Sequence, residues 1–126
     1  MRSNRSYRDL EVWRESMTLV EEIDAATRSF PVAERFGLTA QIRRAAVSIP
    51  SNIGEGSRRR RDKPFRHHLE IALGSQGELE VQIELALRLT IRDAATCERL
   101  TERTARIGRM LNGLINSLES SETTDH

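Results

Sequence analysis

The densest group of side chains that can bind a ligand lies near the middle of the chain, in the segment S-R-R-R-R-D-K-P-F-R-H-H at residues 57–68. Between Arg35 and His68, nine basic residues stand against only Glu55 and Asp62, so this segment has a charge of about +7 while the whole chain has +1. Guanidinium groups bind phosphate oxygens through paired hydrogen bonds, and consecutive arginines repel one another unless an anion or solvent screens them. The pattern therefore favours binding to the phosphate backbone of RNA or DNA, without base specificity and with strong salt dependence.

The predicted contacts to nucleic acid come from this block and from an arginine pair upstream of it. They are Arg43, Arg44, Arg58, Arg59, Arg60, Arg61, Lys63 and Arg66. Phe65 is the only residue of the Phe, Trp or Tyr type within the segment at 57–68, and it fits a buried position. Base stacking is therefore not indicated. A solvated run of charge between two helices is the alternative interpretation of the same residues.

The other reactive residue types do not form a catalytic or metal-binding pattern. A di-iron site in a helix bundle needs Glu-x-x-His, and no glutamate has a histidine three residues later. The adjacent His67 and His68 point about 100° apart on a helix, which prevents joint chelation. The single cysteine, Cys97, falls on an apolar helix seam and is expected to be a buried thiol. We therefore expect no enzymatic activity, no metal and no cofactor.

The elements that position these residues are predicted to be helices within one domain. The chain has 126 residues, and 37% of them are hydrophobic, which is enough for one buried core. Only three residues are proline, so few positions interrupt a helix. Apolar residues at helical spacing predict helices from about Tyr7 to Thr27, from about Leu38, through Phe65 to Leu89, and from about Asp93 to Leu118. Four amphipathic helices with short connections predict an antiparallel up-down four-helix bundle. Its ordered core is expected over residues 7–118, with flexible tails at 1–5 and 120–126.

Two local signals refine the helix boundaries. Ser6 and Asp9 match the S-x-x-D capping box, which predicts the start of the first helix. Pro50 lies inside the apolar pattern of the second helix and removes a backbone hydrogen bond, so a kink or a helix end is expected near Val47 to Ile49.

The third helix has two apolar stripes rather than one. The first stripe is predicted to face the core and consists of Phe65, Leu69, Ala72, Gln76, Leu79, Ile83 and Leu87. The second stripe lies on the opposite side and consists of Ile71, Gly74, Val81, Leu85 and Leu89. No helix of a four-helix bundle is central, so the second stripe predicts self-association through this helix. The alternative is that this stripe widens the intramolecular core.

Three strings resemble the signature of a known family: F-P-V-A-E-R-F-G-L at 30–38, Q-I-R-R-A-A-V-S-I-P-S-N-I-G-E-G at 41–56 and I-A-L-G-S-Q-G-E-L at 71–79. Over about residues 7–118 the chain is similar to bacterial four-helix bundle proteins of the ribosomal-RNA intervening-sequence type. It is also similar to the accessory protein of diversity-generating retroelements, which assists a reverse transcriptase and binds nucleic acid. Gly54 departs from the pattern, because the family more often has alanine there.

The resemblance implies an up-down bundle that assembles into a ring-shaped homopentamer without enzymatic activity. In such a ring Arg43 and Arg44, together with Arg58 to Arg61, would form a positive annulus. The resemblance also leaves open a second function, a protein-interaction scaffold or accessory subunit with no direct role in nucleic-acid binding. No apolar run approaches the ~20 residues of a membrane span, and the polar N-terminus does not match a signal peptide, so a cytoplasmic protein without a membrane partner is expected.

Overall fold

The computed structural model describes residues 7, 10–59 and 61–124, with residues 120–124 as backbone only. Its elements are α1 (Glu11–Thr27), the short 3-10 helix η2 (Val32–Glu34), α2 (Leu38–Ser57), α3 (Asp62–Arg88) and α4 (Ala94–Thr124). Within these residues every regular element is helical, which confirms the predicted all-α class.

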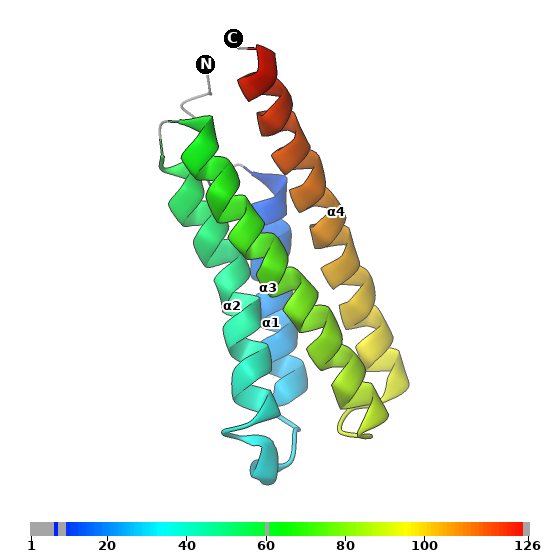
Figure 1. Cartoon of the computed structure of the whole chain (residues 1–126). Helices are drawn as coiled ribbons and strands as arrows, with labels where there is room; N and C mark the ends of the chain where they lie inside the picture. The colour runs from blue at the N-terminus through cyan, green and yellow to red at the C-terminus, as the bar shows by residue number, and fades with distance from the viewer. Residues whose placement is uncertain (1–6, 8–9, 60, 125–126) are drawn as a thin grey trace.

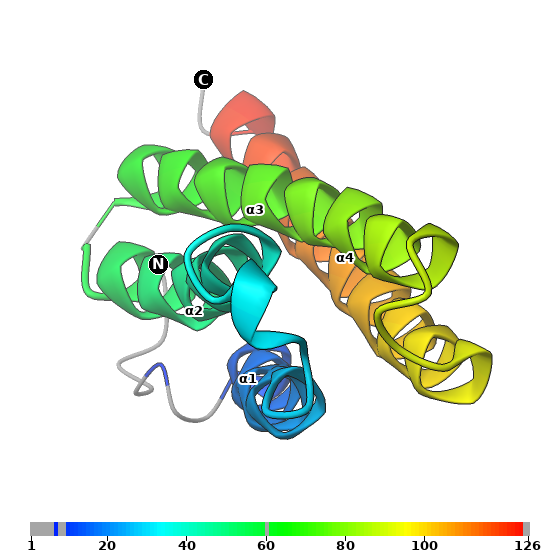
Figure 2. The same cartoon turned by 90° about the horizontal axis from the view of Figure 1, so that it is seen from below.

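The four long helices form an antiparallel up-down bundle (Figures 1 and 2). α2 packs against α3, α3 against α4, and α1 against both α2 and α4, so each helix contacts its two neighbours. The connection between α2 and α3 lies at one end of the bundle, and the segment with η2 and the connection between α3 and α4 lie at the other end (Figure 1). The predicted four-helix bundle is therefore confirmed.

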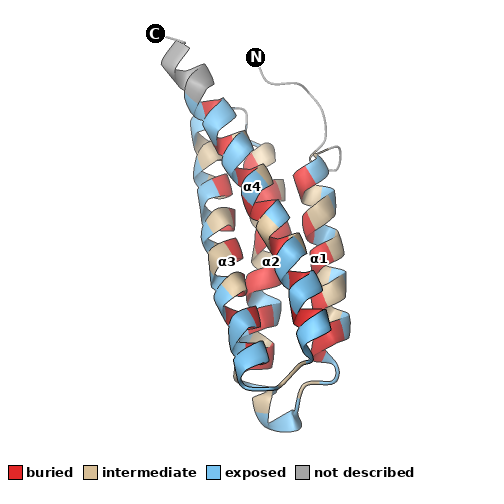
Figure 3. Ribbon diagram, turned by 90° about the vertical axis from the view of Figure 1, so that its right-hand side faces the viewer, coloured by how far each residue is buried: buried red, intermediate tan, exposed pale blue. Residues whose placement is uncertain are grey.

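The core lies between the four helices, where their buried faces meet (Figure 3). On α4 the predicted seam is buried at Cys97, Leu100, Thr104, Ile107, Leu111 and Leu118, but its remaining member, Leu114, is half-buried and Ile115 is buried in its place. On α3 the predicted stripe is buried from Phe65 to Ile83, but Leu87 is exposed and Ala86 is buried in its place. A helix has 3.6 residues per turn, so a 3–4 spacing extended over six turns drifts, and Leu87 has left the core face.

On α1, the apolar spacing predicts one buried face made of Val12, Trp13, Met17, Leu19, Val20 and Ile23, and the structure departs from it. Val12, Leu19 and Ile23 are buried, but Met17 is exposed. The buried position next to it belongs to Ser16, whose hydroxyl donates to the Trp13 carbonyl oxygen at 2.8 Å. A satisfied serine fits a core position that hydrophobic periodicity assigns to an apolar residue.

Of the two outcomes predicted near Val47 to Ile49, a kink or a helix end, the helix end does not occur, because α2 continues through Pro50 to Ser57. An interior proline costs a helix ~3 kcal/mol. Ile49 and Ile53, on either side of Pro50, are fully buried, and each buried side chain of this size contributes about 1.5–3 kcal/mol. Packing of the two isoleucines therefore offsets the cost of the proline.

The ends of two helices also differ from expectation. α1 begins at Glu11 rather than Tyr7, and the predicted cap at Ser6 and Asp9 lies outside the described residues. α4 continues past Leu118 to Thr124, because the polar segment after Leu118 contains no glycine or proline that would stop it. None of the described helices combines the length and the apolar character that a membrane span requires.

Candidate nucleic-acid interface at the basic end

The arginine block forms the connection between α2 and α3, at one end of the bundle. Arg58 follows the last turn of α2, Arg61 precedes the first residue of α3, and Lys63 lies in the first turn of α3. These three residues are exposed, and Arg66 is half-buried one turn further along α3. We call Arg58, Arg59, Arg61, Lys63 and Arg66 the basic end. Arg60, also predicted as a contact, lies outside the described residues.

The acidic residues near the basic end do not neutralise it. Arg59 donates to Glu55 at 2.9 Å in an exposed i,i+4 pair, a kind of pair that contributes only ~0.3–0.5 kcal/mol. Little free energy therefore holds the Arg59 guanidinium on Glu55. Asp62 begins α3, where a carboxylate is favourable beside the positive end of the helix dipole. Arg58 and Arg59 are likewise favourable at the negative end of α2, which gives the block a structural role beside any ligand.

Close packing of α2 against α3 fixes the shape of the basic end. A Cβ atom on Gly56 would lie 2.6 Å from Cβ of His68 and 3.0 Å from Cδ1 of Phe65, so only glycine fits this approach. One turn below, His68 Nδ1 lies 3.3 Å from Asn52 Oδ1. The rings of His67 and His68 meet edge to face with centroids 5.9 Å apart. Among the described residues, no group of three or more His, Cys, Asp or Glu residues is placed to hold a metal ion.

Within one copy the structure does not bring the upstream arginine pair to the basic end. Arg43 precedes Arg58 by fifteen residues on the same helix, a separation of about 22 Å. Arg43 Nε donates to the hydroxyl of Thr27 at 2.8 Å, which ties α2 to the end of α1. Arg44 is exposed and makes no ion pair with a described residue.

A second row of arginines, on α4, was not singled out from the sequence. Arg103 donates to Glu15 at 2.8 Å and also to Glu22, and Arg106 donates to Glu11 at 3.3 Å. The hydrogen bond to Glu22 raises the pKa of Arg103, since it favours the charged guanidinium. These ion pairs join α4 to α1, so the two arginines stabilise the packing of the bundle. Their partners are more than 80 residues apart in sequence, so no local pattern indicates them.

The remaining predicted positions are placed as follows. Cys97 is buried beneath the α3–α4 connection, and burial raises the pKa of its thiol. Val81 and Leu89 are each 61% exposed, and Leu85 is 42% exposed. Ile71 and Gly74 are also exposed. In the single copy the second stripe of α3 therefore does not widen the core.

These features define a class: an all-α four-helix bundle with a strongly basic end and an exposed apolar stripe on its third helix. The family model for the 23S rRNA-intervening sequence protein matches residues 8–113. The chain therefore belongs to the 23S rRNA-intervening sequence protein family, as the resemblance of its three strings predicted.

The fold also matches a solved structure. A protein of unknown function from the S23 ribosomal protein family of Bacteroides thetaiotaomicron superposes with a TM-score of 0.78. It is 24% identical, and the match covers 83% of this chain and 95% of that chain. No curated protein matches the sequence.

Proposed function

We propose that this protein is a non-enzymatic, self-associating protein that binds the phosphate backbone of RNA or DNA through the basic end. The observation that supports this proposal is the clustering of five described basic residues around the α2–α3 connection. Glu55 and Asp62 are the acidic residues of the same segment, and the Glu55 pair is exposed and weak. The family is described by an intervening sequence of 23S rRNA, and a nucleic-acid ligand is consistent with that description.

Self-association would multiply this surface. The exposed stripe on α3, defined by Ile71, Gly74, Val81, Leu85 and Leu89, gives each copy an apolar surface that water solvates poorly. Covering it with a second copy places two or more basic ends in one assembly. Several weak phosphate sites on one particle bind a long polyanion much more tightly than one site does. The homopentamer implied by the family resemblance is one such assembly.

The proposal is tested by measuring affinity for a generic single-stranded RNA as a function of salt. We expect a linear fall of log K with log salt, with a slope of about −0.7 for each phosphate contact. The triple variant Arg58→Ala, Arg59→Ala, Arg61→Ala should weaken binding to all sequences alike and reduce the slope by about two, since three contacts are removed.

The matched control removes three exposed arginines from elsewhere, with Arg28→Ala, Arg99→Ala and Arg109→Ala. Arg28, like Arg59, is in an exposed i,i+4 pair, so the control loses the same charge and a similar local interaction. It should retain most of the affinity and slope. A wild-type slope near zero, or equal losses in the two triple variants, would contradict the proposal.

A second candidate function is a protein-interaction scaffold, favoured by the opposite end of the bundle. Val32 is 86% exposed and Phe36 is 88% exposed on the segment around η2, which projects from the end away from the basic end (Figure 1). The Arg35 guanidinium lies over the Phe36 ring, 5.4 Å from its centroid. Exposed aromatic and arginine side chains are typical anchors of protein interfaces. Unchanged RNA affinity in the Arg58, Arg59, Arg61 triple variant would favour this function over the first.

A further inference from the structure

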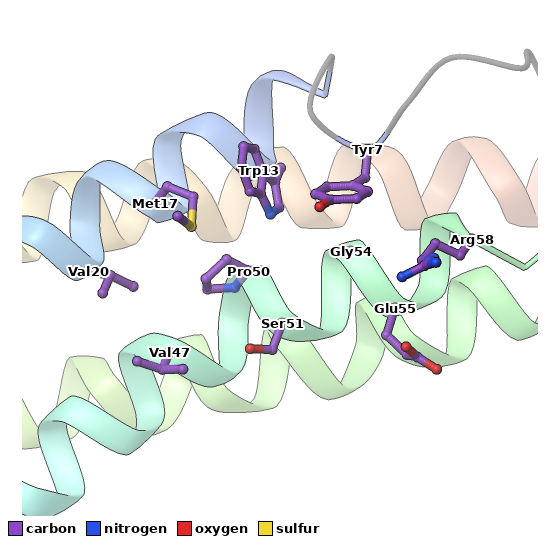
Figure 4. A pocket seen from close by; sticks show the side chains of 10 residues that line it. All are labelled: Tyr7, Trp13, Met17, Val20, Val47, Pro50, Ser51, Gly54, Glu55 and Arg58. Carbon is purple, nitrogen blue, oxygen red and sulfur yellow. The ribbon is translucent and has the colours of Figure 1, made fainter.

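Besides the stripe on α3, the described residues include a second exposed apolar surface, a groove between α1 and α2. Its volume is about 490 Å³. Trp13, Met17 and Val20 line it from α1, and Val47 and Pro50 line it from α2 (Figure 4). Met17 is 40% exposed and Val47 is 49% exposed, so the groove is open to solvent in the single copy. We call these five residues the α1–α2 groove.

The stripe on α3 has the complementary shape. Val81, Leu85 and Leu89 follow one another at four-residue intervals, which places them in a row along one helix. A row of exposed apolar side chains on a helix is a ridge, and ridges pack between the side chains of a neighbouring helix pair. The ridge and the groove are thus the two halves of a helix-in-groove contact.

The charges beside the two surfaces are also complementary. Arg58 borders the groove, and Arg44 lies one turn from Val47 on the same face of α2. Both arginines are exposed, and neither makes an ion pair with a described residue. Glu55 also lines the groove, but it is paired with Arg59 at 2.9 Å, so the border has a net positive charge. On α3 the ridge is accompanied by Glu70 and Glu78, both exposed. A basic border on the groove and acidic residues along the ridge favour contact between these two surfaces over contact of either surface with itself.

The two surfaces lie on different helices and cannot meet within one copy. The groove is formed by α1 and α2, whereas the ridge points away from the core on α3. A contact between different surfaces of two copies is head-to-tail, and it repeats from copy to copy until a ring closes. A two-fold contact of ridge with ridge would leave every groove uncovered.

Resting on the self-association proposed above, we infer that the α3 ridge of one copy docks into the α1–α2 groove of the next. The occupant of the groove is therefore a second copy of this chain, in a head-to-tail arrangement. Arg44 in this arrangement is an intersubunit charge beside the ridge rather than a contact to phosphate.

The arrangement also constrains how the copies are inclined. Ser48 and Ser75 share a 2.8 Å hydrogen bond, so Val47 lies near the level of Ser75 along the bundle. Leu85 is ten residues further along α3, which is about 15 Å from that level. In a closed ring all copies lie at the same height, so the ridge of one copy and the groove of the next must also meet at one height along the ring axis. Because the two surfaces lie at different levels of the bundle, each copy must be tilted against the ring axis.

The test uses two variants that each add one cysteine, together with a short bis-maleimide crosslinker, and Cys97 is left in place because it is buried. Val47→Cys marks the groove and Leu85→Cys marks the ridge. The two variants are co-expressed, purified together, crosslinked and separated on a denaturing gel. We expect a covalent dimer from the mixture and at least a fivefold lower yield from either variant alone.

Each outcome has a distinct meaning. A strong dimer band from Leu85→Cys alone would show a ridge-to-ridge contact and overturn the inference, while self-association through α3 would stand. Light scattering is run on the same uncrosslinked samples and on the wild type. A wild-type monomer at micromolar concentration would overturn both the inference and the self-association on which it rests. An assembled protein that gives no mixed dimer would overturn the inference alone.

A second measurement tests the groove without crosslinking. Met17→Lys in the groove should reduce the assembled mass as much as Leu85→Lys on the ridge, because each introduces a charge into the same contact. The matched control is Phe36→Lys, which changes an exposed apolar residue outside both surfaces and should leave the mass unchanged. Circular dichroism checks that the variants are folded. Dissociation by Leu85→Lys but not by Met17→Lys would also overturn the inference.

Discussion

At the scale of single residues, the connection between α3 and α4 contains the one non-glycine residue with a positive φ among those the structure describes. Thr90 has φ 58°, and the N–H groups of Thr90 and Ile91 donate to the carbonyl oxygens of Leu87 and Ala86 at 3.0 and 2.8 Å. This pair of bonds is the Schellman motif that ends many helices, with threonine at the position usually taken by glycine. A β-branched residue is strained in this left-handed conformation.

Thr90→Gly should raise the free energy of unfolding by about 1 kcal/mol, because glycine adopts the left-handed conformation without steric cost. The measurement is the urea midpoint at fixed protein concentration, with an unchanged m-value. Thr90→Ala is the control and should gain less, since alanine retains a Cβ atom. A Thr90→Gly protein no more stable than the wild type would show that the loop does not strain Thr90.

The start of α4, three residues later, is fixed by Asp93. Its carboxylate accepts hydrogen bonds from the backbone N–H and the hydroxyl of Thr96, each at 2.9 Å. Both bonds lower the pKa of Asp93, and the bond from the Thr96 backbone N–H has the larger effect. An N-cap aspartate of this kind is visible in the sequence, which is why the predicted start of the fourth helix is right. The strain at Thr90 is not visible in the sequence, because the φ angle of that residue depends on how the loop closes.

At the scale of helices, the contact of α2 with α3 depends on Gly56. Gly56→Ala should lower the free energy of unfolding by about 1–3 kcal/mol, because its Cβ would overlap the Cβ of His68 and neither helix backbone can move freely. This loss outweighs the ~1 kcal/mol that alanine gains over glycine in a helix.

Gly113→Ala is the matched control for that substitution. A Cβ on Gly113 of α4 would meet nothing within 4 Å, so this variant should show only the gain in helix propensity. Both changes are followed by thermal and urea unfolding. Equal gains at the two positions would mean that α2 and α3 separate at little cost.

At the scale of the whole molecule, assembly and nucleic-acid binding are expected to be linked. If several basic ends act together, Leu85→Lys should weaken binding of a long RNA by tenfold or more while affecting a short oligonucleotide much less. The added lysine increases the positive charge, so a loss of affinity cannot come from charge alone.

The control for this prediction is Ala95→Lys, which adds the same charge at an exposed position of α4. Binding is measured by fluorescence anisotropy with the two RNA lengths, and the assembled mass is measured by light scattering. Equal losses for long and short RNA, or a dissociated protein that binds long RNA as the wild type does, would show that the basic ends act singly.

The sequence by itself determined the four helices, their antiparallel bundle and most of the buried face. These features follow from apolar spacing, which reflects the pitch of one helix and needs no knowledge of its neighbours. It also placed the arginine block between the predicted second and third helices, because a run of charge interrupts the apolar pattern there. The failures of this reasoning were local: Leu87 drifted off the core face, Met17 lost its core position to Ser16, and α2 continued through Pro50.

Only the tertiary structure decided which side chains meet across helices. It separated Arg43 and Arg44 from the basic end, paired Arg103 with Glu15 and Glu22, and opened the groove between α1 and α2 that Val47 lines. The physical reason is that contacts between helices depend on the level and rotation at which each helix packs. Those quantities are set by interlocking side chains such as Gly56 against His68, far apart in the chain, and no periodicity along one helix contains them.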